Sequence, residues 1–158
     1  LKGTANGITI YDDYAHHPTE ITATLDGFKE GTNRRIVTLF QPHLYSRTRD
    51  FYKEFANAFF SCDCLILAPI YPAREEPIEG VSSKLIADAA IQSGHHNVVL
   101  IEKNEDIVPV TLSLLKANDI LITMGAGNIW QYGEEILKEL KKAVDKNSKS
   151  ENDKNLEK

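Results

Sequence analysis

Apolar strand patterns and amphipathic helix patterns alternate along this chain, and this alternation limits the folds that it can adopt. The predicted strands lie at residues 7–12, 35–41, 62–68, 97–102 and 119–124. The predicted helices lie at residues 18–30, 48–60, 82–93, 105–117 and 128–144. Repeats of strand and helix join parallel strands by right-handed crossovers. The sequence therefore predicts an α/β fold, a Rossmann-like three-layer sandwich whose mostly parallel sheet is flanked by helices.

The composition is that of one globular domain. The chain has 158 residues and a net charge of −5, which gives no electrostatic attraction to nucleic acid or to an anionic membrane. No apolar run approaches the roughly 20 residues that span a bilayer, and no signal-peptide pattern is present, so we expect a cytoplasmic protein. Residues 1–144 are expected to form the domain. Residues 145–158 carry four acids, four lysines and one apolar residue, and are expected to be disordered.

A polar run follows the first predicted strand and includes Asp12, Asp13, Tyr14 and His16. Residues 17–20 serve helix initiation, because proline suits the first helical turn and an acid at the third position reaches the capping backbone. Helix initiation does not account for the four residues before it. There a carboxylate can accept hydrogen bonds from a ribose diol, an aromatic ring can pack on a base, and an imidazole can donate to phosphate oxygens. The structural alternative is that both aspartates only solvate a loop.

The same run contains ligand types for a metal site. A di-metal phosphoesterase could use Asp12, Asp13, His16 and His17. No second set of acids and histidines follows downstream. The histidine pair at 95–96 comes after a glycine in a turn, where we expect it to face solvent. We therefore predict no metal site in this chain.

A second polar run follows the predicted strand at 35–41. Pro42 ends that strand by forcing an extended approach to His43. Arg47 precedes a helix for which Thr48 is the predicted cap, and there a guanidinium can hold a carboxylate with two parallel hydrogen bonds. His43 can orient or deprotonate an amine, because histidine titrates near neutral pH. We expect Arg47 to bind a ligand, with a surface ion pair as the structural alternative.

Two later loops carry weaker signals. The loop at 70–77 is long, and in it Arg74 and Glu75 either touch a ligand or pair with each other. The segment 125–128 joins the last strand to the last helix and contains two glycines. It lacks the third glycine of a dinucleotide fingerprint, so we interpret it as tight backbone packing.

The two cysteines, Cys62 and Cys64, lie two residues apart in a predicted strand. At that spacing both side chains would point to one face of the sheet. This geometry suits two buried thiols better than a disulfide or a zinc site. A reducing compartment is the simplest interpretation.

Taken together, these runs resemble the C-terminal domain of the Mur ligases. The resemblance extends to about Val144 and rests on Gly7 with the strand after it, and on five further motifs. These are Asp-Asp-Tyr-Ala-His-His-Pro-Thr-Glu at 12–20, Phe-Gln-Pro-His at 40–43, Tyr-Ser-Arg-Thr at 45–48, Ile-Tyr-Pro-Ala-Arg-Glu at 70–75 and Met-Gly-Ala-Gly at 124–127. The resemblance implies that ATP phosphorylates the lactyl carboxylate of UDP-N-acetylmuramate and that the amine of L-alanine attacks the acyl phosphate. This reaction belongs to peptidoglycan precursor synthesis.

The resemblance also implies roles for individual residues. The implied nucleotide-binding residues are Asp12, Asp13, Tyr14 and His16, and the implied L-alanine-binding residues are Arg47, His43 and Tyr14. Arg47 would hold the alanine carboxylate, and His43 and His16 would be the catalytic residues. Many such ligases have an arginine where this chain has Leu44, so Arg47 would act here without that second arginine.

The partners of the domain are also implied by the resemblance. In this family an N-terminal domain holds the UDP-sugar, and a central domain carries the phosphate-binding loop and the magnesium sites. No G-x-x-x-x-G-K-[ST] motif occurs in these 158 residues. We therefore expect ATP and Mg²⁺ to act in the full-length enzyme and the fragment alone to be inactive. The alternatives are a related ligase that attaches a peptide to UDP-N-acetylmuramate, a stand-alone nucleotide-sensing module and the metal-dependent phosphoesterase.

Overall fold

The computed structural model describes the backbone of residues 1–156 and the side chains of residues 1–144. The strands are β1 (Gly3–Ala5), β2 (Ile8–Asp13), β3 (Ile36–Phe40), β4 (Cys64–Leu67), β5 (Val98–Leu100) and β6 (Ile120–Met124). The helices are α1 (Pro18–Gly31), α2 (Tyr45–Ala58), α3 (Lys84–Gln92), the 3₁₀ helix η1 (Asn104–Asp106), α4 (Ile107–Leu114) and α5 (Ile129–Leu156). The described residues form one six-stranded sheet in the order β1-β2-β6-β3-β4-β5. Neighbouring strands pair in parallel except for β1 and β2.

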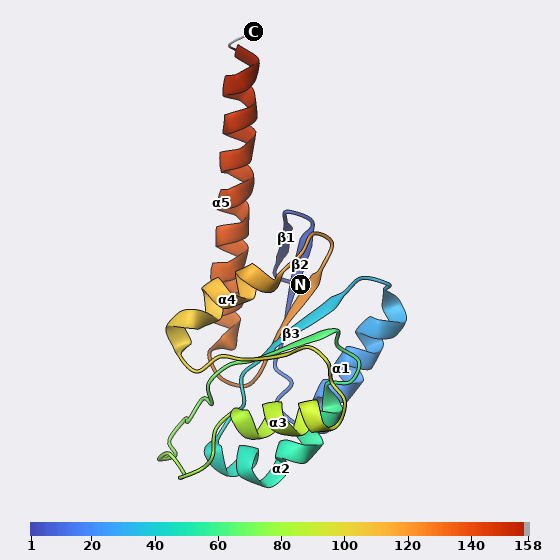
Figure 1. Ribbon diagram of the computed structural model, residues 1–158, viewed down its shortest axis with the longest axis vertical. Helices are drawn as coiled ribbons and strands as arrows, with labels where there is room; N and C mark the ends of the chain where they lie inside the picture. The colour runs from blue at the N-terminus through green and yellow to red at the C-terminus, as the bar shows by residue number, and fades with distance from the viewer. Residues whose placement is uncertain (157–158) are drawn as a thin grey trace.

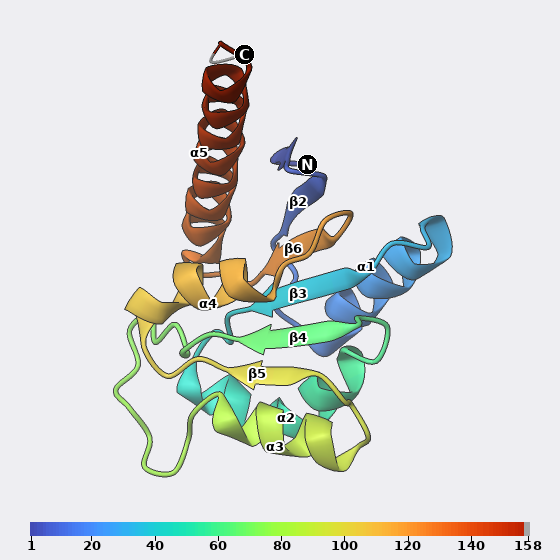
Figure 2. The ribbon, with the colours of Figure 1, turned by 45° about the horizontal axis from the view of Figure 1, so that its top comes forward.

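Helices cover both faces of this sheet. Helices α1, α2 and α3 pack on one face, and α4 and α5 pack on the other (Figure 1). In Figure 2, β3, β4 and β5 run side by side in one direction, with α2 and α3 below them and α4 above. The predicted α/β fold, a three-layer sandwich with a mostly parallel sheet, is confirmed.

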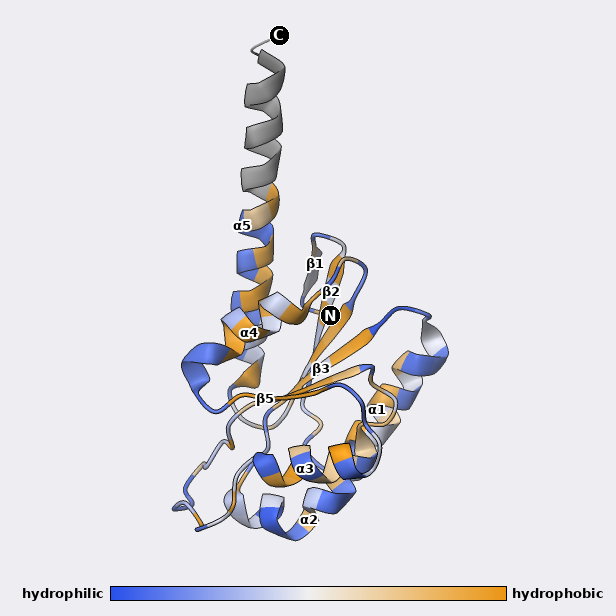
Figure 3. Ribbon diagram, in the orientation of Figure 1, coloured by the Kyte–Doolittle hydropathy of each residue, from blue (hydrophilic) through white to orange (hydrophobic). Residues whose placement is uncertain are grey.

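The central strands are buried on both faces, which explains their nearly unbroken apolar sequences. All residues of β3, β4 and β6 are buried, and Figure 3 shows these strands as predominantly hydrophobic. Phe40 packs against Phe55 and Phe59, with ring centroids 5.4 and 5.0 Å apart. Burying one large apolar side chain contributes roughly 1.5–3 kcal/mol. This packed core fixes the ends of the strands from which the loops at the sheet edge begin.

Helix α1 begins as the sequence predicts. Pro18 is its first residue, where the missing N–H costs nothing. The Glu20 carboxylate accepts hydrogen bonds from the backbone N–H groups of His16 and His17, both at 3.1 Å. The bond from His16, and then that from His17, lowers the pKa of Glu20. These contacts fix the path of the loop between β2 and α1.

Some element boundaries differ from the prediction. Strand β1 was not predicted, and it joins β2 through Asn6 and Gly7, which both have positive φ. Helix α2 begins at Tyr45 rather than after Thr48. Thr48 therefore lies inside the helix, and its hydroxyl donates to the Leu44 carbonyl at 2.9 Å.

The last helix is longer than predicted. It was expected to end at Val144 with that side chain buried, but α5 runs to Leu156 and Val144 is 39% exposed. Among the side chains of α5 that the structure describes, Leu140 is the last apolar one that is buried. No glycine or proline lies between 145 and 156, so the sequence contains no strong signal to stop a helix. The predicted disorder of residues 145–158 concerns a segment whose side chains lie outside the described residues, and it stays a prediction.

The cysteines are both buried, as predicted, but they point to opposite faces of the sheet. Strand β4 begins only at Cys64. Cys62 lies in the preceding turn, where its N–H donates to the Phe59 carbonyl at 3.1 Å. The rule that side chains two residues apart in a strand share a face therefore does not apply to this pair, and the prediction of a common face is wrong.

His95 was predicted to face solvent, and this prediction is wrong, because the residue is buried with only 8% of its surface exposed. Its Nδ1 accepts a hydrogen bond from the Asn97 N–H at 3.3 Å. Its Nε2 therefore carries the proton and donates to the Cys62 carbonyl at 3.1 Å. An imidazole that is satisfied at both nitrogens can be buried in its neutral form. His96 is exposed, as expected.

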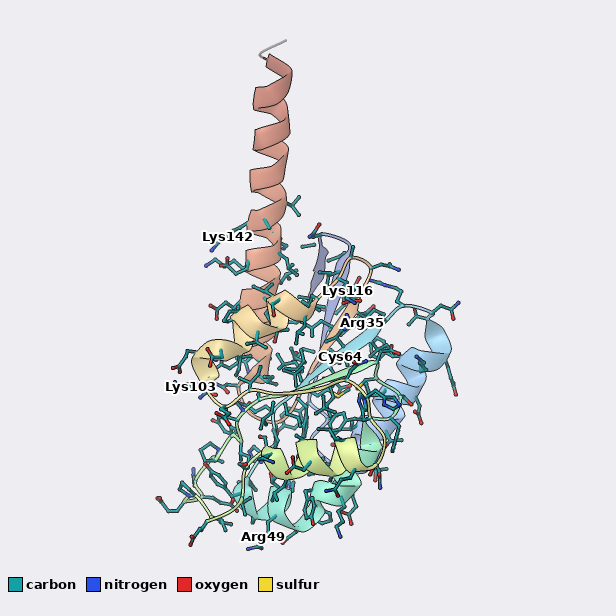
Figure 4. The ribbon with its side chains drawn as sticks, viewed as in Figure 1. Arg35, Arg49, Cys64, Lys103, Lys116 and Lys142 are labelled. Atoms are coloured by element: carbon teal, nitrogen blue, oxygen red, sulfur yellow. The ribbon has the colours of Figure 1, made fainter. Side chains whose placement is uncertain are left out.

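An ion pair joins Arg35, just before β3, to Asp119, just before β6. Their atoms Nη1 and Oδ2 lie 2.7 Å apart. The Lys116 backbone N–H donates to the same carboxylate oxygen at 2.8 Å. Figure 4 labels Arg35 and Lys116 close together at this end of the sheet. Among the described residues, we find no helix that combines the length and apolar character of a membrane span.

Candidate functional site

Strands β2, β6 and β3 lie side by side and end level with one another. Asp13 of β2 and Phe40 of β3 both pair with Met124 of β6. The polar runs that follow β2 and β3 therefore leave the sheet on either side of β6, at its carboxyl edge. Two strand spacings, about 9–10 Å, separate the ends of β2 and β3.

The loops after β2 and β3 lean toward each other and form a row of rings. The ring centroids lie 5.1 Å apart for Tyr14 and His16, and 6.3 Å apart for His16 and His43. Tyr71 extends the row, because its ring stacks on His43 at 5.8 Å. The structure thus brings together the predicted residues Tyr14, His16 and His43, and it adds Tyr71 from the loop after β4.

Two glycines after β6 allow these loops to approach closely. Gly125 has φ 144°, and its N–H donates to the Asp13 carbonyl at 3.2 Å. A Cβ at Gly125 would lie 2.7 Å from the Gln41 backbone oxygen. A Cβ at Gly127 would lie 2.5 Å from Gln41 Oε1 and 2.6 Å from Tyr71 Cγ. The predicted tight backbone packing of this segment is confirmed.

Arg47 and His43 each bury a nitrogen that has no hydrogen-bond partner among the described residues, namely Arg47 Nη1 and His43 Nδ1. Leaving such an atom unpaired costs about 1–3 kcal/mol, so a ligand that pairs with it is favoured. Burial lowers the pKa of His43 most, the charges of Arg47 and His16 lower it further, and the negative charge of Glu75 opposes them in part. His43 is therefore neutral at neutral pH and can accept a proton. Arg47 thus offers a hydrogen-bond donor, its guanidinium, and the neighbouring His43 offers a base, its imidazole.

The backbone before α2 determines where Arg47 lies. Leu44 has φ 71° and ψ 136°, which is strained for a residue with a side chain. Its N–H donates to the Tyr71 carbonyl at 2.9 Å, and its carbonyl accepts from the Thr48 N–H at 3.2 Å. Arg47 consequently lies in the first turn of α2 and not before the helix. The predicted cap at Thr48 is wrong because the chain becomes helical immediately after Leu44.

Asp12 and Asp13 point to opposite faces of the sheet, as neighbours in a strand must. Asp12 Oδ1 accepts a hydrogen bond from the Thr123 hydroxyl at 2.7 Å. Asp13 Oδ1 accepts from the Ala15 N–H at 2.7 Å, and Asp13 Oδ2 accepts from the Thr24 hydroxyl at 2.9 Å. A carboxylate oxygen can accept two hydrogen bonds, so both aspartates keep acceptor capacity. They face different sides and cannot serve the same pair of ligand hydroxyls.

The neighbouring histidines have different surroundings. His16 Nδ1 donates to the Tyr14 carbonyl at 2.9 Å, which leaves Nε2 available for another partner. His17 is exposed, and its ring lies 5.8 Å from that of Phe51. Within the part of the chain that the structure describes, no group of three His, Cys, Asp or Glu side chains could hold a metal ion. The arrangement gives no support to the phosphoesterase alternative.

Some residues of this site were missed or left undecided by the sequence. Glu75 does not pair with Arg74; its carboxylate accepts hydrogen bonds from the N–H and the hydroxyl of Ser46. Gln41 is 3% exposed, and its Oε1 has no partner among the described side chains and backbone. Gln41 and Tyr71 lie within motifs that the sequence identifies. Their contacts with the glycines after β6 become visible only in three dimensions.

Fold and site together define an α/β domain that presents polar side chains at the carboxyl edge of a mostly parallel sheet. Residues 1–127 match the family described as Mur ligase, glutamate ligase domain, and the chain belongs to this family. It is 46% identical over 143 residues to a UDP-N-acetylmuramate–L-alanine ligase of Geotalea daltonii. That alignment covers 90% of this chain and 31% of the relative. The chain thus spans about a third of the length of the curated relatives that it matches.

Solved structures show the same fold. A murein peptide ligase of Psychrobacter arcticus superposes with a TM-score of 0.70 at 26% identity, over 87% of this chain and 28% of that one. A UDP-N-acetylmuramate–alanine ligase of Thermotoga maritima superposes with a TM-score of 0.66 at 26% identity, over 86% of this chain and 27% of that one. The resemblance found in the sequence is therefore confirmed at the level of the family.

Proposed function

We propose that this chain is the C-terminal domain of a cytoplasmic, ATP-dependent ligase that joins L-alanine to UDP-N-acetylmuramate. The observation that carries the proposal is the pair of buried, unpartnered nitrogens on Arg47 and His43. Together they match the two ends of an amino acid, its carboxylate and its amine. The name of the relatives at about 46% identity supports L-alanine as that amino acid.

In this proposal Arg47 holds the alanine carboxylate with two parallel hydrogen bonds. His43 accepts a proton from the alanine ammonium group, which a neutral imidazole can do. The freed amine attacks the carbonyl carbon of an acyl phosphate, so that a C–N bond forms and the bond to the phosphate oxygen breaks. Phosphate leaves with the second proton of the amine, as hydrogen phosphate, and the amide UDP-N-acetylmuramoyl-L-alanine remains. Tyr14, which is 69% exposed, covers the bound amino acid at the mouth of the site.

The loop after β2 is proposed to bind the nucleotide. Its Tyr14 ring packs on ATP, and His16 lies next to the reacting phosphate, where its Nε2 is available. Asp12 and Asp13 supply acceptors for the ribose hydroxyls. Because their side chains face opposite sides of the sheet, one carboxylate makes this contact and the other organises the loop.

ATP and Mg²⁺ are proposed to act in the longer protein. The described residues include no group of three acidic, histidine or cysteine side chains that fits a metal ion, so we assign no magnesium ligand to this chain and derive no step through the ion. No phosphate-binding loop motif occurs in its sequence. The N-terminal and central domains are therefore the proposed partners of this domain, and the domain alone is expected to have no ligase activity.

The proposal is tested on the full-length protein by measuring ADP release with ATP, UDP-N-acetylmuramate and one amine at a time. We expect release with L-alanine and little with a peptide. The likeness to the murein peptide ligase makes a peptide the relevant competitor. Release that depends on a peptide and not on L-alanine would establish the alternative ligase. Phosphate release without any amine would refute a ligase altogether.

A further inference from the structure

The first turn of α2 has no cap of its own, although it carries Arg47. Its N-cap residue is Leu44, whose side chain cannot accept a hydrogen bond, and no acidic residue lies in the turn. The first N–H groups of a helix have no partner within the helix. Without an acceptor from elsewhere, this turn would fray.

Glu75 supplies the missing acceptor from the loop after β4. One oxygen of its carboxylate accepts a hydrogen bond from the Ser46 N–H at 3.0 Å, and the other accepts from the Ser46 hydroxyl. The hydrogen bonds from Ser46, together with one from the Tyr45 N–H, lower the pKa of Glu75. A charged carboxylate at the positive end of a helix is doubly favourable, because it meets both the free N–H groups and the helix dipole.

The loop that carries Glu75 is itself attached to the site. The Tyr71 N–H donates to the Pro42 carbonyl at 2.8 Å, and the Leu44 N–H donates back to the Tyr71 carbonyl at 2.9 Å. Four residues further along, the Glu75 N–H donates to the Pro72 carbonyl at 2.9 Å and closes a turn. The same short segment therefore holds His43 by stacking and α2 by capping.

We propose that Glu75 is a positioning residue that fixes Arg47 for binding of the amino-acid carboxylate. The inference rests on the proposed function and names a residue through which that site is built. Glu75 binds Ser46, the residue next to Arg47, while Arg47 Nη1 keeps no partner in the described structure. The carboxylate thus holds the turn without occupying the guanidinium. Arg47 is left poised for a ligand.

The experiment uses the full-length protein with the variants Glu75→Ala, Glu75→Gln and Glu76→Ala. Glu76 is the matched control, because it is the exposed neighbouring glutamate. Loss of a helix cap destabilises the first turn of the helix. The free-energy cost, if it falls on ligand binding, corresponds to an affinity about tenfold lower. We expect Glu75→Ala to raise the KM for L-alanine about tenfold while the KM for ATP changes less than about twofold. Glu75→Gln keeps one acceptor oxygen and should recover part of the loss.

A double-mutant cycle separates positioning from a general loss of stability. Ser46→Ala removes the hydroxyl that Glu75 accepts from, so its effect on the KM for L-alanine should be smaller in the Glu75→Ala background than in the wild type. If Glu75→Ala fails to fold, Glu75→Gln with the same cycle decides the matter. An unchanged KM for L-alanine in either folded Glu75 variant overturns the inference and leaves the proposed function intact. If the wild-type protein shows no L-alanine-dependent ADP release, the proposed function fails, and this inference fails with it.

Discussion

The imidazole of His43 stacks on the ring of Tyr71, with centroids 5.8 Å apart and ring planes inclined by only 15°. The backbones of these two residues also form an isolated parallel bridge beyond the end of the sheet. One face of the imidazole is therefore occupied by protein, and its Nδ1 is buried. A base that is held in this way loses little freedom when a ligand binds, which favours reaction from the bound geometry.

Arg47 should determine the affinity for the amino acid. Replacing it by alanine removes a charged hydrogen-bonding pair worth about 1.5–3 kcal/mol, so the KM for L-alanine should rise roughly 10- to 100-fold. Lysine should restore only part of the affinity, because it cannot donate two parallel bonds. Steady-state kinetics with varied L-alanine measure this. The control is Arg49→Ala, since Arg49 is exposed, pairs with Asp50 at 2.8 Å and lies on the outer side of α2 (Figure 4). Equal effects of both variants would contradict the assignment.

Activity should fall on acidification at a pH below the ordinary pKa of histidine, about 6.5. Burial first, and then the charges of Arg47 and His16, lower the pKa of His43, while the charge of Glu75 opposes them in part; the neutral form therefore persists until the pH falls through that lowered pKa. Arg47→Gln removes one of these positive charges and should shift the pKa of His43 upward. An NMR titration of the His43 ring measures the shift. A downward or absent shift would show that Arg47 does not act on this imidazole.

Two glycines should respond to alanine in opposite ways. At Gly127 a Cβ would lie 2.5 Å from Gln41 Oε1 and 2.6 Å from Tyr71 Cγ, so Gly127→Ala should destabilise the fold by about 1–3 kcal/mol and disturb the site. At Gly27, inside α1, a Cβ would meet nothing within 4 Å. Gly27→Ala should stabilise the helix by about 0.5–1 kcal/mol. Urea unfolding of both variants provides the comparison, and a neutral Gly127→Ala would refute the close packing of this segment.

The thiols should be inert in the folded protein. Burial raises the pKa of Cys62 to about 12, and burial also raises the pKa of Cys64. Because the thiolate is the reactive form, a thiol reagent at mildly alkaline pH should label neither residue until denaturant is added. The two residues lie in core clusters on opposite faces of the sheet, so an oxidant should not join them. A disulfide between them in the native protein would contradict this placement.

Much of the fold follows from periodicity. The strands at the centre of the sheet are buried throughout and almost entirely apolar, and helices with one apolar face follow the strands, as in α1 with Ile21 and Leu25. This pattern was sufficient to predict the layers. It was insufficient for β1, which has three residues, and for the start of α2, where Leu44 adopts a backbone conformation that its residue type does not indicate.

The site could be predicted in part for the same reason. Tyr14, His16, His43 and Arg47 stand at strand ends, where polar residues need a functional explanation, and the structure gathers them at one edge. The role of Glu75 depends on a hydrogen bond between residues 29 positions apart, and no local pattern encodes it. The roles of all these residues in binding and catalysis stay predictions, which the experiments above test.

The strand order has a consequence for how the protein is made. Strand β6 is the last strand in the chain, yet it lies between β2 and β3. While a nascent chain is still emerging from the ribosome, the gap between those two early strands stays open until residues 120–124 arrive. High contact order of this kind slows folding, so the loops after β2 and β3 take their final places only after β6 has been made. A polypeptide that ends before residue 120 would therefore contain every residue of the histidine and arginine motifs and still lack the strand that lies between β2 and β3.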